Sequence, residues 1–272
     1  ATRRGGRVIA EQLINGWEPE LDHGDSILRA FVHAVADRMA FMTTAAGGRV
    51  ERLDDALIVD ARSTVPFDNG IVLLRPPPLI DIDAIVQRAG EVIDRTRPHV
   101  LLSAWLLPDL RAHGYDLMGH PPFMYRPAAP APVTRPDGLD IRQVQDADEL
   151  AVFVRTLIDA YPMPRGETTT LADPRVLSGP VKLFLGYAGD RPVATAGVYV
   201  GRYVNDVEWV STMPDARRRG YGEALTWAAT LANPDAPAAL IASDDGQPVY
   251  ERMGYVRVQR MTMWFRRGAS PR

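Results

Sequence analysis

Apolar residues recur at helical and strand spacing through the second half of the chain, which makes its elements predictable. The polar run 146–149 resembles a helix capping box, and apolar residues follow it at helical spacing. In chain order the pattern predicts a strand at 141–144, a helix that follows the polar run and is ended by residues 161–164, strands at 181–187 and 192–200 joined by the hairpin signal 188–191, a strand at 207–212, a helix at 222–231, a strand at 238–242, a short helix at 248–253 and a last strand at 256–265. Strands that alternate with helices indicate an α/β layer.

The first half carries fewer clear signals. Residues 26–42 have apolar positions on one helical face, and residues 82–93 predict a second helix. Residues 57–59 and 71–74 are typical of strands, with Asp68-Asn69-Gly70 between them as a hairpin turn, and 100–105 predicts a buried strand.

A proline-rich segment divides the chain almost in half. Four prolines lie within residues 127–136, and they favour a stiff, extended linker because proline lacks a backbone donor and has a fixed φ. The predicted organisation is therefore one domain at 1–126, a linker at 127–138 and a second domain at 139–272.

Composition narrows the possible functions. The 272 residues are 46% apolar and 24% charged with a net charge of −3, which is ordinary for a globular protein and does not favour nucleic acid or a membrane surface as a partner. There is no cysteine, so disulfides, thiolate metal sites and a cysteine nucleophile are excluded. The five histidines lie in the first half without metal-ligand spacing, so no metal is expected. No apolar segment approaches the ~20 residues of a membrane span, and no secretory signal is visible, so we expect a cytoplasmic protein.

One segment of the second half combines the features of an anion site. A predicted strand enters a basic, glycine-containing turn, residues 217–223, which leads directly into a helix. The helix start would present unpaired amides and its positive dipole end, beside the guanidinium groups of Arg217, Arg218 and Arg219. Gly220 and Gly222 would let a ligand approach the backbone closely. A diphosphate is the natural ligand of this basic turn.

The basic turn resembles a motif of the GNAT (GCN5-related) N-acetyltransferases. Arg217-Arg-Arg-Gly220-Tyr-Gly222 matches their Q/R-x-x-G-x-G/A motif, which binds the pyrophosphate of acetyl-CoA. Downstream, the segment 242–255 is similar to the family's second motif and ends in Tyr-Glu-Arg-Met-Gly-Tyr. The resemblance covers about residues 139–266.

This resemblance implies a reaction and a set of binding residues. The family transfers an acetyl group from acetyl-CoA to a primary amine by direct attack. It implies Tyr250 as the proton donor to the leaving thiolate, although Tyr250 could also be a core aromatic residue. Ser243 would contact the cofactor or cap the short helix. The remaining cofactor-binding positions would be Val210, Ser211 and Thr212 on the strand, and Arg217, Arg218, Arg219, Gly220, Tyr221, Gly222 and Glu223 in the basic turn.

The general base has two candidates on the preceding strand. Asp206 falls where family members that acetylate histones carry a glutamate, and Glu208 lies two residues on, so strand alternation places both carboxylates on one face. We expect Asp206 rather than Glu208 to be the base. Alternatively, both are hydrated charges at the strand end.

The first half resembles the end of the same fold without its cofactor site. Residues 110–115 and 124–127 are similar to the family's closing segments, whereas Arg75-Pro76-Pro77-Pro78 lacks the amides that a phosphate needs. The prediction is an α/β protein of two tandem GNAT-like domains, each a mixed, mostly antiparallel sheet flanked by helices, with a degenerate N-terminal domain as in tandem members such as mycothiol synthase. The alternative function is a non-catalytic acyl-CoA sensor or regulatory scaffold.

Overall fold

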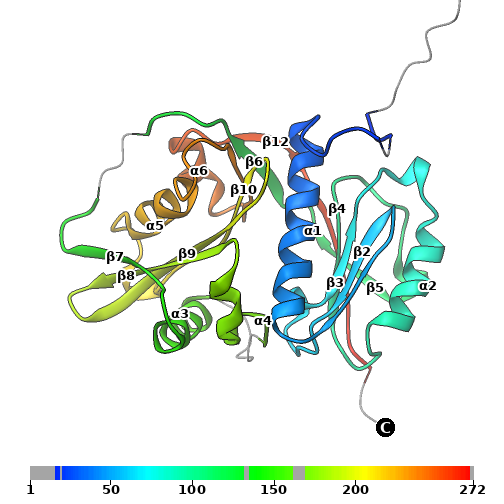
Figure 1. Ribbon diagram of the computed structural model, residues 1–272, viewed down its shortest axis with the longest axis horizontal. Coiled ribbons are helices and arrows are strands. Elements are labelled where there is room, and N and C mark those ends of the chain that lie inside the picture. Colours follow the sequence, from blue (N-terminus) through cyan, green and yellow to red (C-terminus); the bar gives the residue numbers. More distant parts are fainter. Residues whose placement is uncertain (1–15, 19, 132–134, 162–168, 270–272) are drawn as a thin grey trace, which may run out of the picture.

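The computed structural model describes residues 16–18, 20–131, 135–161 and 169–269. Two twisted sheets lie side by side with one long helix, α1, upright between them (Figure 1). Both sheets are mixed, mostly antiparallel and flanked by helices, so the predicted fold class is confirmed. The linker positions 132–134 lie outside the described residues.

The first half of the chain begins with α1, whose first turn is capped by Ser26 Oγ accepting from the Arg29 amide at 3.1 Å. Three short 3-10 turns, Pro66–Asp68, Pro77–Leu79 and Arg111–His113, connect some of its elements. Its helices and strands are α1 (Ile27–Ala45), β1 (Arg49–Arg52), β2 (Ala56–Asp60), β3 (Gly70–Leu73), α2 (Ile82–Val92), β4 (His99–Ser103), β5 (Tyr115–Gly119) and β6 (Pro122–Arg126).

The second half follows the predicted order closely. The predicted capping run is confirmed, because Asp146 Oδ1 accepts from the Glu149 amide at 2.9 Å and starts the first helix of this half. The elements are β7 (Leu139–Gln143), α3 (Ala147–Ala160), α4 (Thr169–Ala172), a 3-10 turn (Pro174–Ser178), β8 (Val181–Ala188), β9 (Arg191–Val200), β10 (Asn205–Thr212), a 3-10 turn (Pro214–Ala216), α5 (Tyr221–Thr230), β11 (Ala238–Ile241), α6 (Gln247–Arg252), β12 (Val256–Arg260) and β13 (Thr262–Arg266).

Each half donates one strand to the sheet of the other half. Among the described residues, one sheet has the order β1-β2-β3-β4-β13-β5 and the other β12-β6-β11-β10-β9-β8-β7. Thus β6 of the first half lies between β12 and β11, and β13 of the second half lies between β4 and β5. The strand order therefore does not divide at the predicted domain boundary.

The single last strand predicted at 256–265 is wrong. The chain leaves one sheet after β12 and enters the other at β13, with the buried Met261 at the crossing. The Met261 amide donates to the carbonyl of Pro121 at 2.9 Å, and Pro121 is the crossing point between β5 and β6. The two crossings therefore bond to each other, a contact between distant residues that an apolar pattern cannot reveal.

The predicted hairpin turn at 68–70 is also wrong. Strands β2 and β3 do pair antiparallel, but the connection between them is the longer segment 61–69. Asn69 is fully buried and fastens this segment, accepting from the Ala61 amide at 3.0 Å and donating to the carbonyl of Pro98 at 3.0 Å. Asn69 is thus an internal hydrogen-bonding residue rather than a turn residue.

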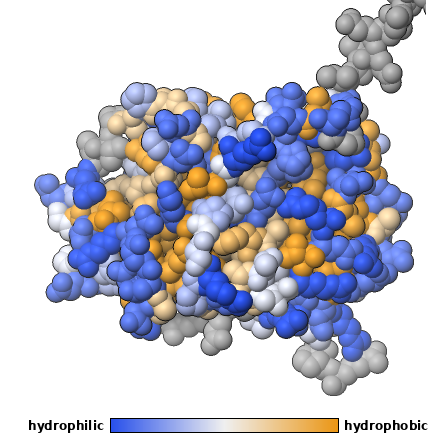
Figure 2. Space-filling model, in the orientation of Figure 1, coloured by the Kyte–Doolittle hydropathy of each residue, from blue (hydrophilic) through white to orange (hydrophobic). Residues whose placement is uncertain are grey.

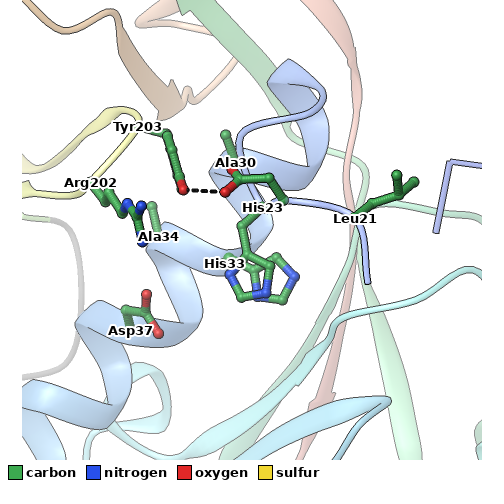
Figure 3. Close-up of a pocket in the computed structure, with 9 residues that line it drawn as sticks. Leu21, His23, Ala30, His33, Ala34, Asp37, Arg202 and Tyr203 are labelled. Atoms are coloured by element: carbon green, nitrogen blue, oxygen red, sulfur yellow. Dashed lines mark hydrogen bonds between the residues drawn. The ribbon is translucent and has the colours of Figure 1, made fainter. Parts of the chain in front are cut away.

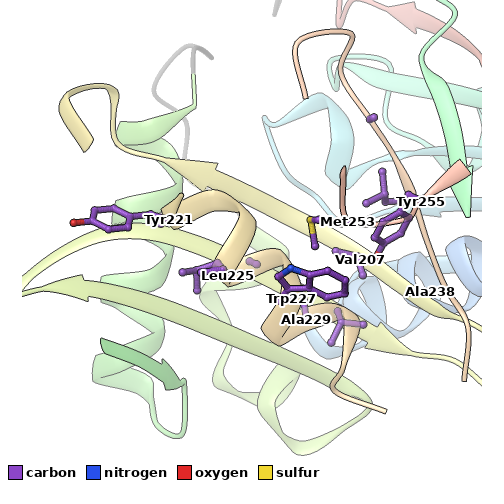
Figure 4. Close-up of a cluster of buried hydrophobic side chains, with 14 of the residues drawn as sticks. Val207, Tyr221, Leu225, Trp227, Ala229, Ala238, Met253 and Tyr255 are labelled. Carbon is purple, nitrogen blue, oxygen red and sulfur yellow. The ribbon is translucent and has the colours of Figure 1, made fainter. Parts of the chain in front are cut away.

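The core of the second half holds α5 against the sheet. Trp227 and Leu225 of α5 pack with Met253 and Tyr255 in one buried cluster (Figure 4). Arg126, at the end of β6, lies over the Trp227 ring with 4.9 Å between its guanidinium carbon and the ring centroid, and it donates to the carbonyl of Met253. The donated strand is therefore anchored in the core of its host half.

Helix α1 contacts both sheets. Its Phe31 stacks on Phe123 of β6 with ring centroids 4.3 Å apart, and its buried face covers β2 and β3. No described helix combines the length and apolar character that crossing a bilayer requires.

The strand exchange predicts that the second half is not an independent folding unit. Residues 139–272 alone lack β6, which leaves β11 and β12 without their common neighbour and exposes their backbone groups. We expect this fragment to lack near-ultraviolet circular dichroism and cooperative urea unfolding. As a control, the full chain with a protease site inserted in the linker 127–138 should stay associated in gel filtration after cleavage. A natively folded 139–272 monomer would contradict this.

Candidate functional site

Two parallel strands separate in the middle of the second sheet. The registered pairs between β10 and β11 are Asn205 with Ala238 and Asp206 with Ala239. A bulge follows in β10 between Glu208 and Ser211, where Trp209 has φ +54°. The edge of 207–212 that faces β11 is therefore open, while the other edge stays paired with β9.

A cavity of about 920 Å³ occupies this opening. Its walls come from both halves of the chain: β10, β11, α3, α4 and Tyr250 on one side, and α1, the 61–69 segment and the crossing at 119–121 on the other. On the face shown in Figure 2, apolar side chains reach the surface where the two halves meet.

The basic turn begins α5 where β10 ends. Gly220 is the N-cap residue with φ +78°, a left-handed conformation that favours glycine, and no side chain caps the helix. The amides of Tyr221, Gly222 and Glu223 therefore begin the helix without intrahelical partners. A Cβ on Gly222 would lie 2.9 Å from Thr212 Oγ1, so Gly222 permits close contact between α5 and β10.

The three arginines of the basic turn differ in their contacts. Arg217 donates to the carbonyls of Thr212 and Ala160, both at 3.2 Å, so it fastens the turn to β10 and α3. Arg218 and Arg219 are exposed and form no ion pair with a side chain in the described part of the chain. Two guanidinium groups thus remain available to an anion at the helix start.

The other predicted binding residues on β10 also differ. Val210 lies in the cavity wall. Ser211 is buried, and its hydroxyl shares a 2.7 Å hydrogen bond with Thr195 of β9, so its side chain faces the protein. In the basic turn, Tyr221 is a core residue, and Glu223 Oε2 is 3.7 Å from a guanidinium nitrogen of Arg252.

Arg38 of α1 joins both candidate carboxylates. Its Nε lies 2.7 Å from Asp206 Oδ2, and its Nη2 lies 2.7 Å from Glu208 Oε1. Its guanidinium also covers the Trp209 ring at 5.5 Å. Both carboxylates are therefore on one face, as strand alternation predicted, but they are bound in an ion cluster rather than freely hydrated.

The two carboxylates differ in access. The side chain of Asp206 is 0% exposed, and it is absent from the cavity wall, whereas that of Glu208 is 27% exposed and lines the cavity. Burial raises the pKa of Asp206, and burial with the nearby Asp206 charge raises the pKa of Glu208 to about 7, against the opposing effect of Arg38. The geometry therefore favours Glu208 over Asp206 as a base.

Tyr250 of α6 lines the same cavity. Its ring packs edge-on against Tyr255 with centroids 6.0 Å apart, and burial raises the pKa of its phenol, which keeps the proton bound. Ser243 also lines the cavity, and its Oγ accepts from the Gly246 amide at 3.0 Å, so it has the capping contact that was one of its two predicted roles.

In the first half, the segment between β3 and α2 differs from the basic turn that precedes α5. Between β3 and α2 the chain passes through Pro76, Pro77 and Pro78, and the Asp81 carboxylate occupies the helix start by accepting from the Ala84 amide at 3.0 Å. A carboxylate at this position repels a phosphate. That the first half holds no cofactor stays a prediction. The first half contributes part of the cavity wall and Arg38, and of these Arg38 was not singled out from the sequence.

A second cavity of about 370 Å³ lies beside the start of α1 (Figure 3). His23 stacks on His33 with ring centroids 3.5 Å apart, and burial lowers the pKa of His33 to about 3, so the ring is neutral. Tyr203 donates to Asp22 at 2.7 Å. These contacts fasten the segment before α1. Among the described residues, no group of histidines and carboxylates is arranged to hold a metal ion.

No protein-family model matches the sequence, and no curated protein matches it significantly. Solved structures do share its fold. They include a GCN5-related N-acetyltransferase from Kribbella flavida (TM-score 0.61, 21% identity, covering 86% of this chain and 96% of that one) and a conserved protein of unknown function from Staphylococcus epidermidis (0.60, 15%, 82% and 95%). A GCN5-related N-acetyltransferase from Sphaerobacter thermophilus is also similar (0.53, 15%, 89% and 95%). The likeness extends over both halves and establishes the fold.

The ion cluster predicts a pH-dependent effect of Arg38→Met. Without Arg38, two buried carboxylates lose their counter-ion, which typically costs about 3–5 kcal/mol of unfolding free energy when both are charged. Because burial already raises both pKa values, the variant binds protons more readily when folded than unfolded, and its stability falls as pH rises. We expect the full loss in urea unfolding at pH 8 and a smaller loss at pH 5.

The matched control is Arg111→Met, which removes an exposed ion pair with Asp109 and should leave unfolding unchanged at both pH values. An equal loss for Arg38→Met at pH 5 and pH 8 would show that its packing, rather than its charge, stabilises the fold.

Proposed function

We propose that the protein is an acetyl-CoA-dependent N-acetyltransferase that acts on a primary amine. The observation that carries this proposal is the convergence of an open β10 edge, an uncapped helix start at Gly220 and one cavity containing Glu208 and Tyr250. The fold shared with GCN5-related N-acetyltransferases supports it.

The basic turn fits the pyrophosphate of acetyl-CoA. The amides from Arg218 to Glu223, together with the unpaired Arg218 and Arg219, would bind the two phosphates. The open edge of 207–212 would bind the pantetheine arm through backbone hydrogen bonds, with Val210 in contact. The thioester would then lie between β10 and β11, near Tyr250.

The chemistry needs one proton acceptor and one proton donor. Glu208 would accept a proton from the ammonium form of the acceptor, so that the neutral nitrogen can attack the thioester carbonyl. The carbon–nitrogen bond forms, the carbon–sulfur bond breaks, and Tyr250 would give its proton to the leaving thiolate. The second proton that the nitrogen loses as the amide forms would restore Tyr250 through solvent, and Glu208 would release its proton to solvent. Asp206 and Arg38 act behind Glu208, where they set its charge and position.

Gly220→Asp tests the cofactor site. A side chain and a negative charge at the basic turn should weaken acetyl-CoA binding at least ~10-fold in calorimetry, or about 1.4 kcal/mol. The control Gly189→Asp introduces the same residue at another left-handed glycine, φ +62°, in the β8–β9 hairpin, and should bind normally. Wild-type stoichiometry should be one per chain. Unchanged affinity of Gly220→Asp would exclude the basic turn as the phosphate site.

The pH profile separates the two carboxylates. Because the pKa of Glu208 is raised to about 7, kcat/KM for CoA release should fall as pH drops through about 7, and Glu208→Gln should remove this limb. Asp206→Asn removes a charge that raises the Glu208 pKa, so in this variant kcat/KM should still fall toward acid, but at a lower pH than in the wild type.

Ionisation of the amine affects the kcat/KM profiles of the wild type and of both variants equally, so only a difference between these profiles is diagnostic. If the fall of kcat/KM at low pH is absent in Asp206→Asn and present in Glu208→Gln, Asp206 is the base. A protein that binds acetyl-CoA but releases no CoA with any amine would be a sensor rather than an enzyme.

A further inference from the structure

The cavity is larger and more apolar than an acetyl group alone requires. Its volume of about 920 Å³ is near the upper end for sites that enclose drug-sized ligands. The thioester would enter from the β10–β11 opening, and the opposite wall belongs to the first half of the chain. The space beyond Glu208 is therefore available to the acceptor.

The face of α1 toward this space is mostly apolar; its polar lining residues are Arg38 and Thr43. Val35, Met39 and Met42 recur at helical spacing along it, and Leu157 of α3 and Leu171 of α4 belong to the same lining. Methionine side chains are flexible and adapt to apolar ligands of different shape. This wall can bury a hydrocarbon body but offers it few polar partners.

Apolar side chains also lie exposed at the edge of the cavity. Phe67, Met118 and Tyr161 are 40%, 49% and 47% exposed, and all three belong to the cavity lining. Large apolar side chains exposed together typically mark a binding surface. The apolar wall therefore continues to the solvent.

The charged groups of the lining are mostly engaged with one another. Asp244 is paired with Arg260 at 3.0 Å, and Asp68 accepts from Thr170 at 2.8 Å. Among the described residues, Arg38 offsets one of the two charges on Asp206 and Glu208, which leaves one net negative charge beside the reacting nitrogen. This site suits one ammonium group, whereas further ammonium groups of a polycation would lie against the apolar wall.

We propose that the acceptor is a primary monoamine with an apolar alkyl or aryl body, rather than a polyamine or a polyhydroxylated amine. This inference rests on the proposed acetyl transfer. It deepens that proposal by assigning the wall donated by the first half to the acceptor's hydrocarbon body.

The test is a series of n-alkylamines from ethylamine to hexylamine, with 2-phenylethylamine, ethanolamine and spermidine for comparison. Burial of a methylene favours binding about fourfold, so kcat/KM for CoA release should rise roughly 250-fold over the four methylenes between ethylamine and hexylamine. Ethanolamine and spermidine should stay at or below ethylamine. A flat series, or spermidine as the best acceptor, would overturn the acceptor class while leaving acetyl transfer intact.

Two variants locate the effect. Phe67→Ser removes an apolar side chain from the cavity edge and should lower kcat/KM about tenfold for hexylamine but not for ethylamine. Leu106→Ser changes an equally apolar side chain that is 77% exposed outside the cavity lining, and should alter neither. Equal effects of the two variants would overturn the assignment of the wall.

A binding measurement separates this inference from the proposed function. Calorimetry with N-acetylhexylamine and N-acetylethanolamine, each in the presence of CoA, needs no turnover. Tighter binding of N-acetylhexylamine supports the apolar site even if no amine releases CoA, a result that would overturn acetyl transfer alone. Equal binding of the two would overturn the apolar site.

Discussion

The reciprocal exchange of β6 and β13 fixes how the two halves of the chain meet. Each sheet is completed by a strand from the other half, and the two crossings bond to each other between Met261 and Pro121. A rotation of one half against the other would break ladder hydrogen bonds in both sheets. This constraint holds α1 in place beside β10, so Arg38 reaches two carboxylates more than 160 residues away in the chain.

The opening between β10 and β11 depends on local conformations that only the assembled sheet supports. The bulge at Trp209 carries a left-handed φ on an aromatic residue, which is unfavourable in isolation. The Trp209 carbonyl accepts from Thr195 Oγ1 at 2.8 Å, and Arg38 lies over its ring. A Cβ at position 197 of β9 would come within 2.5 Å of the Trp209 ring, so the absence of a side chain at Gly197 leaves room for this ring. Contacts from β9 and α1 together thus stabilise the left-handed conformation of Trp209.

The sequence predicts local features well and distant contacts poorly. The basic turn is contiguous, so the strand, Gly220 and the helix start can be recognised from their order, and the helices at 27–45 and 147–160 follow from caps and apolar spacing. Arg38 carries no such signal, because an arginine on a helix is ordinarily a solvated charge. The same limitation explains Asn69 and Met261, whose roles depend on partners that adjoin them only in the folded chain.

The start of α2 and the cavity wall that the first half contributes both depend on how its sheet and helices pack. Asp81 caps α2 and three prolines precede it, so the segment between β3 and α2 has few free amides, and β3 and β4 are paired. The closed sheet of the first half provides a rigid support for α1, whose apolar face and single guanidinium complete the cavity of the other half.

Arg38 has two opposing effects on the carboxylates it joins. A cation at 2.7 Å makes it possible to bury Asp206 and Glu208 together, yet it also stabilises their charged forms and so would weaken Glu208 as a base. Burial and the second carboxylate act in the other direction and keep the pKa of Glu208 at about 7. If Glu208 stood alone beside Arg38, its pKa would be lower and its proton affinity poorer. Under the proposed function, Asp206 would therefore contribute through its charge although it lies outside the cavity wall, and this would be a reason for two carboxylates where one contacts the amine.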